Sequence, residues 1–154
     1  MIQWSNILFD ALWAALPAAG FAMIFNVPRS ALPFCAIGGT LTYGIRELLL
    51  NFYSIELSTF IASTTIGIIG VFWSRKYIMP RPVYTVASII PMIPGTYAYE
   101  MMISLIAMNN NGVTDMLLQN FIQNGLHAIS ILFAIAFGLV LPSLYYTKRQ
   151  QPIL

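Results

Sequence analysis

Helix-breaking and charged residues interrupt one of the apolar stretches of this sequence. Pro91, Pro94 and Gly95 lie close together, and Glu100 follows them. A proline removes a backbone donor and clashes with the carbonyl group one turn earlier, so we expect no continuous helix here. Two half-helices are expected instead, the second beginning at about Gly95 or Thr96. The free amide groups and partial positive charge at its start suit a carboxylate ligand. The alternative is a plain proline kink without a ligand.

A second candidate for carboxylate binding is an arginine inside another apolar segment. Arg46 lies one turn after Tyr43 and directly before Glu47. Its guanidinium group stays charged in any environment, so it needs a partner or contact with water. It either binds a substrate carboxylate or pairs with Glu47 or reaches the membrane surface. The predicted substrate-binding residues are Tyr43, Arg46, Pro91, Pro94, Gly95, Thr96 and Tyr97.

Ionisable residues at membrane depth are candidates for coupling or gating. A carboxyl group that is removed from water can bind and release a proton near neutral pH, which makes Glu100 such a candidate. Asn120, Asn124 and His127 recur at helical spacing and therefore share one face of a later segment. We assign coupling or gating to Glu100, Asn124 and His127. The competing interpretation is structural, with Glu100 in an ion pair and His127 hydrogen-bonded to a neighbouring helix; Asp10 faces the same choice.

The composition shows which kind of fold must position these residues. Of 154 residues, 58% are hydrophobic and only 8% are charged, whereas soluble domains contain about 25% charged residues. A soluble monomer is therefore excluded, and so is intrinsic disorder. The seven basic residues are dispersed, so no nucleic-acid surface is expected.

Enzymatic chemistry has no visible basis in the sequence. There is no Ser-His-Asp arrangement, no phosphate-binding loop and no metal-ligand cluster, so we expect no enzyme, no catalytic residues, no metal and no cofactor. The single cysteine, Cys35, is predicted to be a small buried residue. The first basic residue is Arg29, so a cleaved signal peptide is not expected.

We predict an all-α, polytopic membrane helix bundle, with residues 1–154 as a single membrane domain. A helix that crosses a bilayer needs about 20 mostly apolar residues, and about five segments qualify, one of them broken between Pro91 and Gly95. The predicted spans are residues 3–25, 31–50, 55–73, 83–108 and 118–146. A four-span alternative ranks second, because Arg46 and Glu47 weaken the second segment as a span. Within the third segment, small residues at helical spacing predict close packing against other helices: Ser63, Gly67, Gly70 and Ser74.

The basic residues predict an orientation. With five spans, six of the seven fall on one side: Arg29, Arg75, Lys76, Arg81, Lys148 and Arg149. The positive-inside rule then predicts a periplasmic N-terminus and a cytoplasmic C-terminus. Arg29 and Arg81 are thus predicted to lie at the cytoplasmic face.

Two stretches of the chain resemble a known family. Residues 27–33, the pair Gly38-Gly39 and residues 43–46 are similar to the opening of the C-terminal membrane domain of the threonine/serine exporter (ThrE) family. Residues 81–85 and 89–97 are similar to its most specific motif, a basic-Pro start, an apolar run and Pro-x-x-Pro-Gly near a tyrosine. The resemblance extends over nearly the whole chain. It implies functional importance for Arg29, Arg46, Pro91, Pro94, Gly95 and Tyr97.

The resemblance also implies a function and a partner. The family exports small carboxylated metabolites across the bacterial inner membrane, among them threonine and serine, and succinate in its split form. The chain length matches the small YjjB-type subunit of split exporters, which works with a larger YjjP-type membrane subunit. Five spans also make half of a typical repeat-built carrier, so a larger subunit, a homo-oligomer or both are expected in the lipid bilayer. The alternatives are a non-transporting assembly or scaffold subunit and a passive channel.

Overall fold

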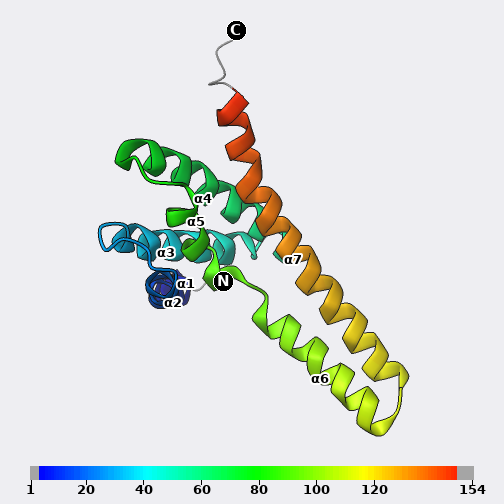
Figure 1. Cartoon of the computed structure of the whole chain (residues 1–154). Coiled ribbons are helices and arrows are strands. Elements are labelled where there is room, and N and C mark those ends of the chain that lie inside the picture. The colour runs from blue at the N-terminus through cyan, green and yellow to red at the C-terminus, as the bar shows by residue number, and fades with distance from the viewer. Residues whose placement is uncertain (1–3, 149–154) are drawn as a thin grey trace. The chain divides into compact units, whose positions relative to one another are not determined.

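A computed structural model describes residues 4–148, and every regular element in that range is a helix. The elements are α1 (Trp4–Trp13), α2 (Ala15–Ile24), α3 (Leu32–Leu49), α4 (Ile55–Tyr77), α5 (Pro82–Ser88), the 3-10 turn η1 (Ile90–Met92), α6 (Gly95–Asn111) and α7 (Asp115–Lys148) (Figure 1). The prediction of an all-α fold is confirmed. Contacts divide the chain into unit 1, up to Met92 and from Ala134 onward, and unit 2, Ile93–Phe133. Helix α7 contributes to both units.

Helix α3 is the central element of unit 1, in contact with α1, α2, α4 and α5. Two adjacent glycines permit this close packing. A Cβ atom at Gly38 would overlap the side chain of Ser88 on α5, and one at Gly39 would overlap Ala18 on α2. The hydroxyl group of Thr42, one turn later, donates to the carbonyl oxygen of Ser88 at 2.7 Å. Small residues thus hold α2 and α5 against α3.

The small residues predicted to form a packing ridge on α4 contact two other helices of unit 1. The hydroxyl group of Ser63 donates to the carbonyl oxygen of Ala134 on α7 at 3.2 Å. A Cβ atom at Gly67 would lie 3.3 Å from the α7 backbone, and one at Gly70 would overlap Thr85 on α5. The prediction that this side of the segment serves close helix packing is therefore confirmed for these three positions.

Aromatic side chains show which helix ends meet in unit 1. The ring of Phe34, in the first turn of α3, lies 5.1 Å from the ring of Trp73 and 4.8 Å from that of Tyr77 near the end of α4. It also lies 5.8 Å from the ring of Tyr84 near the start of α5. The start of α3, the end of α4 and the start of α5 therefore lie together, and α3 runs antiparallel to α4.

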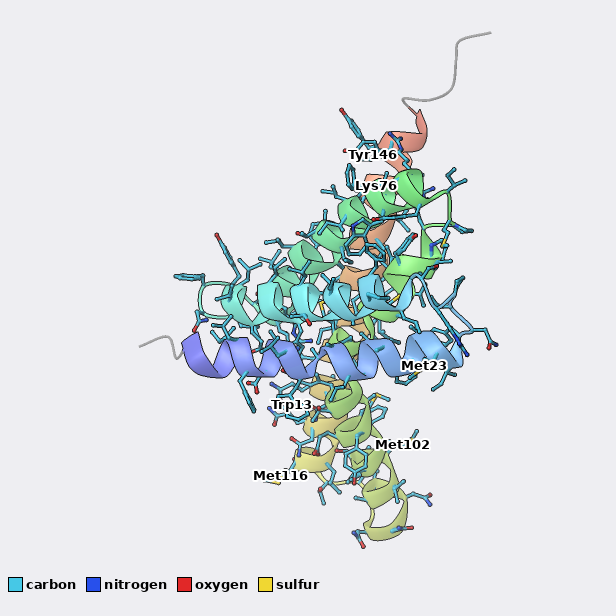
Figure 2. All side chains as sticks on the ribbon, turned by 90° about the vertical axis from the view of Figure 1, so that its left-hand side faces the viewer. Trp13, Met23, Lys76, Met102, Met116 and Tyr146 are labelled. Atoms are coloured by element: carbon cyan, nitrogen blue, oxygen red, sulfur yellow. The ribbon has the colours of Figure 1, made fainter. Side chains whose placement is uncertain are left out.

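The same end of unit 1 includes the C-terminal part of α7. The guanidinium carbon of Arg75 lies 5.1 Å from the centre of the Tyr146 ring, and Figure 2 shows Lys76 and Tyr146 at this end. We call it the basic end, because the base-containing segments adjoin it: Arg29, Arg75, Lys76 and Arg81. Aromatic residues near bases are typical of a membrane–water interface.

The predicted helix break is confirmed. Helix α5 ends at Ser88, η1 occupies Ile90–Met92, and α6 begins at Gly95. Both half-helices are too short to cross a membrane alone, and only the pair Pro82–Met92 and Gly95–Asn111 qualifies together.

The number of spans differs from the predicted five. By length and composition, the described residues provide three spans, or up to four if the broken pair counts as one: Ile7–Ile24, Ile55–Tyr77, Asp115–Tyr146 and the pair. The prediction of a helical bundle with one broken helix is confirmed. A count of up to four spans agrees with the four-span alternative. Helix α3 does not qualify, although it is 18 residues long, because Arg46, Glu47 and its glycines and threonines lower its hydropathy. Its central place among four helices offers a physical reason why it is less apolar.

Unit 2 is a helical hairpin of α6 and the first part of α7, which lie side by side in Figure 1. Gly112 follows the last residue of α6 and has a φ angle of +85°, a backbone conformation that residues with a side chain rarely adopt. Gly125 of α7 faces α6, since a Cβ atom there would lie 3.1 Å from the sulfur of Met101.

Candidate substrate-binding site

Arg46 of α3 directs its guanidinium group to η1, the short turn within the helix break. Its Nη1 donates to the carbonyl oxygen of Met92, the last residue of η1, at 3.3 Å. Its Nε is buried and has no hydrogen-bond partner. The structure thus places a permanent positive charge at the end of η1, with Nη1 paired to a backbone carbonyl group and the buried Nε unpaired.

Tyr43 connects this cation to two carboxyl groups. The guanidinium carbon of Arg46 lies 5.8 Å from the centre of the Tyr43 ring. The hydroxyl group of Tyr43 lies within electrostatic range of Glu47, one turn further along α3, and of Asp10 on α1. Arg46 therefore belongs to a cluster with one positive and two potentially negative side chains, which we call the Arg46 cluster: Asp10, Tyr43, Arg46 and Glu47.

The residues of the break are divided between the two units. Pro91 lies in unit 1, where it is partly buried near Gly39 of α3. Pro94, Gly95 and Thr96 lie in unit 2, at the start of α6.

The start of α6 has backbone amide groups without a partner inside the helix, and it has open space beside Gly95. The amide of Gly95 donates to the carbonyl oxygen of Ile93 at 2.8 Å, and that of Ala98 to Pro94 at 3.1 Å. The amides of Thr96 and Tyr97 lie in the first turn, where a helix supplies no carbonyl partners. A Cβ atom added at Gly95 would meet nothing within 4 Å, so the fold of this chain does not require glycine here.

Unit 2 brings two of the predicted residues into contact. The ring of Tyr97 lies 5.2 Å from that of His127, with an angle of 32° between the planes. Asn124, one turn before His127, donates from its side-chain amide to the carbonyl oxygen of Asn120 at 3.0 Å. The side chain of Glu100 is exposed, which differs from the expectation of a buried carboxyl group: the described residues of this chain do not cover it.

The remaining candidates lie elsewhere. Arg29 is exposed before α3, and Arg81 is half-buried before α5. Cys35 is fully buried, as predicted, and its thiol donates to the carbonyl oxygen of Val83 at 3.2 Å. Among residues 4–148, no group of three metal-ligating side chains is found.

Two members of the site were not predicted. The carbonyl oxygen of Met92 accepts a hydrogen bond from Arg46, but a pattern of side chains in the sequence does not predict which backbone carbonyl group will be the acceptor. The proximity of Glu47 to Tyr43 does have a signal in the sequence, because residues four apart on a helix face each other.

Comparison with known proteins adds evidence from the whole chain. A family model described as "Threonine/Serine exporter, ThrE" matches residues 10–145. A protein of Haemophilus influenzae described only as an uncharacterized protein is 44% identical over 149 residues, which make up 96% of this chain and 50% of that protein. The chain thus spans about half the length of this curated relative. No solved structure matches the chain.

Proposed function

The chain belongs to the threonine/serine exporter family, and from this premise we propose that it is a subunit of an inner-membrane secondary exporter of small carboxylated metabolites. The family is one of membrane transporters, which agrees with the apolar helices of the chain and not with an enzyme. Succinate, threonine and serine are the proposed substrates, since each presents a carboxylate to a cationic site.

The observation that carries the proposal is the guanidinium group of Arg46. A charge inside an apolar helix bundle is costly, so it marks a functional position unless it is fully paired. The buried Nε of Arg46 has no hydrogen-bond partner, and a guanidinium group can bind a carboxylate with two parallel hydrogen bonds. We assign Arg46 and Tyr43 to substrate binding, with Pro91 shaping the turn that Arg46 contacts.

The Arg46 cluster also contains groups that oppose anion binding. A substrate carboxylate near Arg46 is attracted by the guanidinium group and repelled by the carboxylates of Glu47 and Asp10. The balance of these charges therefore sets how strongly the cluster holds an anion.

In unit 2, taken by itself, we assign Pro94, Gly95, Thr96 and Tyr97 to substrate binding, through the first amide groups of α6. Helix starts of this kind face anionic groups in other transporters. Glu100, Asn124 and His127 are assigned to coupling or gating. The ring contact between Tyr97 and His127 supports a link between these two assignments.

The partner and the orientation are part of the proposal. The matched relative is about twice as long as this chain, which supports a larger YjjP-type membrane subunit that supplies the other half of the carrier. The exposed side chain of Glu100 agrees with a surface that such a partner covers. The basic end of unit 1 supports an orientation in which the C-terminus is cytoplasmic and the N-terminus periplasmic.

The test is efflux of labelled succinate, threonine and serine from cells that lack this chain, with the chain and its larger subunit restored. We expect Arg46→Gln to lower efflux at least tenfold while the complex still assembles, and Arg46→Lys to retain part of it. Arg75→Gln, at an exposed position outside the assigned residues, is the matched control and should remain within twofold. Full efflux with Arg46→Gln contradicts the binding role, and efflux that does not require the chain favours a scaffold subunit.

A further inference from the structure

A cationic cavity lies in unit 1, at the basic end and apart from the Arg46 cluster. It has a volume of about 310 Å³ and lies among α4, the start of α5 and the C-terminal part of α7. The residues that matter to its chemistry are Gly67, Arg81, Thr85, Val86, Leu139 and Ser143. It shares no lining residue with the Arg46 cluster.

Arg81 supplies the charge of this cavity. Its side chain is half-buried, and its Nη1 is buried without a hydrogen-bond partner. None of the residues that line the cavity is acidic, so the cavity itself provides no counter-charge. A guanidinium nitrogen that is removed from water without an acceptor is unfavourable. An anionic group in the cavity would supply that acceptor.

The two hydroxyl groups in the wall are used by the protein itself. Thr85 donates to the carbonyl oxygen of Arg81 at 3.2 Å, and Ser143 donates to that of Val140 at 2.8 Å. The hydroxyl oxygens of Thr85 and Ser143 can still accept hydrogen bonds, but both hydroxyl protons are already donated to these carbonyl groups. Arg81 is therefore the group that would hold an anion, with the hydroxyl groups as its polar surroundings.

The remainder of the wall is aliphatic. Val86, which is 39% exposed, and Leu139 line the cavity together with Gly67. The cavity therefore joins a cationic group to a hydrocarbon surface. A small soluble anion would use only the first of these, whereas an amphiphilic ligand uses both.

The location favours a lipid as the ligand. Trp73 and Tyr84, whose rings lie 5.8 Å apart, belong to the aromatic group at the same end of unit 1. Aromatic rings beside basic residues are typical of the headgroup level of a bilayer. Basic pockets between membrane helices at that level bind anionic lipid headgroups.

We propose that this cavity binds the phosphate group of an anionic phospholipid, with Arg81 on the phosphate and Val86 and Leu139 against the glycerol and first acyl carbons. A free phosphate shares the polar chemistry but does not contact the aliphatic wall. The proposal does not depend on transport by the chain.

The test uses the purified full-length chain in detergent and measures bound lipid by native mass spectrometry. We expect phosphatidylglycerol to bind at least several-fold more tightly than phosphatidylcholine. Arg81→Gln should weaken phosphatidylglycerol binding roughly tenfold, because a charge-assisted contact is lost. Arg75→Gln changes the same charge at the same end, outside this cavity, and should change binding less than twofold. Equal losses for both variants contradict a specific site.

A second pair of variants tests the cavity without a change of charge. Leu139→Trp fills the space and should weaken phosphatidylglycerol binding several-fold, whereas Leu144→Trp, at an exposed position on the same helix, should not. Inorganic phosphate is the separate arm for the free anion. If it displaces the lipid at equal concentration, or if Leu139→Trp binds lipid normally, the lipid proposal is wrong.

Discussion

Arg46 and Met92 are 46 positions apart in the chain and are joined by a hydrogen bond of 3.3 Å from the guanidinium Nη1 to the carbonyl oxygen. Met92 is the last residue of η1, within the break between α5 and α6, and Arg46 lies near the end of the central helix α3. The bond therefore fixes the short turn η1 to α3, the central helix of unit 1. Any ligand that attracts the guanidinium group competes with the Met92 carbonyl, which links occupancy of Arg46 to the geometry of the break.

The carboxyl group of Glu47 should oppose binding of an anionic substrate at Arg46. Glu47→Gln removes the negative charge but keeps the size of the side chain and an oxygen that can accept a hydrogen bond. We expect the apparent KM for succinate efflux to fall about threefold to tenfold, because a nearby like charge is removed. Asp115→Asn, at an exposed position on α7, is the control and should leave KM unchanged. Complete loss of efflux with Glu47→Gln would instead make Glu47 an essential proton carrier.

The contact between α3 and α5 should be sensitive to one methyl group. Gly38→Ala places a Cβ atom into the side chain of Ser88, and α5 must move to make room. We expect a loss of about 1–3 kcal/mol in stability, typical of overpacking, visible as a lower thermal midpoint of the purified chain. Gly20→Ala is the control, since a Cβ atom there meets nothing within 4 Å; it should be neutral or stabilise α2 by up to about 1 kcal/mol. Equal midpoints for both variants would contradict the tight α3–α5 contact.

Sequence alone predicted the features that local chemistry determines. The break between Ser88 and Gly95 follows from what Pro91 and Pro94 do to their own backbone, and the packing of Ser63 and Gly67 follows from side-chain size at helical spacing. The acceptor of Arg46 and the exposure of Glu100 depend on which helices meet, and no spacing rule gives that. The number of spans was ambiguous for the same reason: the hydropathy of α3 does not reveal that other helices surround it.

A substitution at Gly95 should show whether this residue contacts the substrate or has a structural role. Gly95→Ala adds a methyl group in open space at the start of α6, so we expect an unchanged thermal midpoint. If substrate meets the first amide groups of α6, the methyl group obstructs that approach, and the KM for efflux should rise several-fold. Gly112→Ala gives the opposite pattern, since φ is +85° there: the strain should lower stability by about 1 kcal/mol or more with little effect on KM. Normal KM with Gly95→Ala contradicts the assigned contact.

The five-span and four-span arrangements differ in where the two ends of α3 lie. The helix has 18 residues and is therefore about 27 Å long, close to the hydrocarbon thickness of about 30 Å. It also runs antiparallel to α4, a qualified span, with Phe34 against Trp73 and Tyr77. This packing favours a crossing helix that its neighbours shield from lipid, despite Arg46.

Cysteine labelling distinguishes the two arrangements. Cys35 is fully buried, so the native chain should give little background with a maleimide, and single cysteines can be added directly. We expect Asn51→Cys to react with a membrane-impermeant maleimide in whole cells, and Ser30→Cys only after permeabilisation, since Ser30 lies at the basic end. The permeant reagent, which should label both, controls for exposure. Labelling of both residues from the same side would mean that α3 does not cross, and the basic residues of the chain would then be divided between the two faces of the membrane.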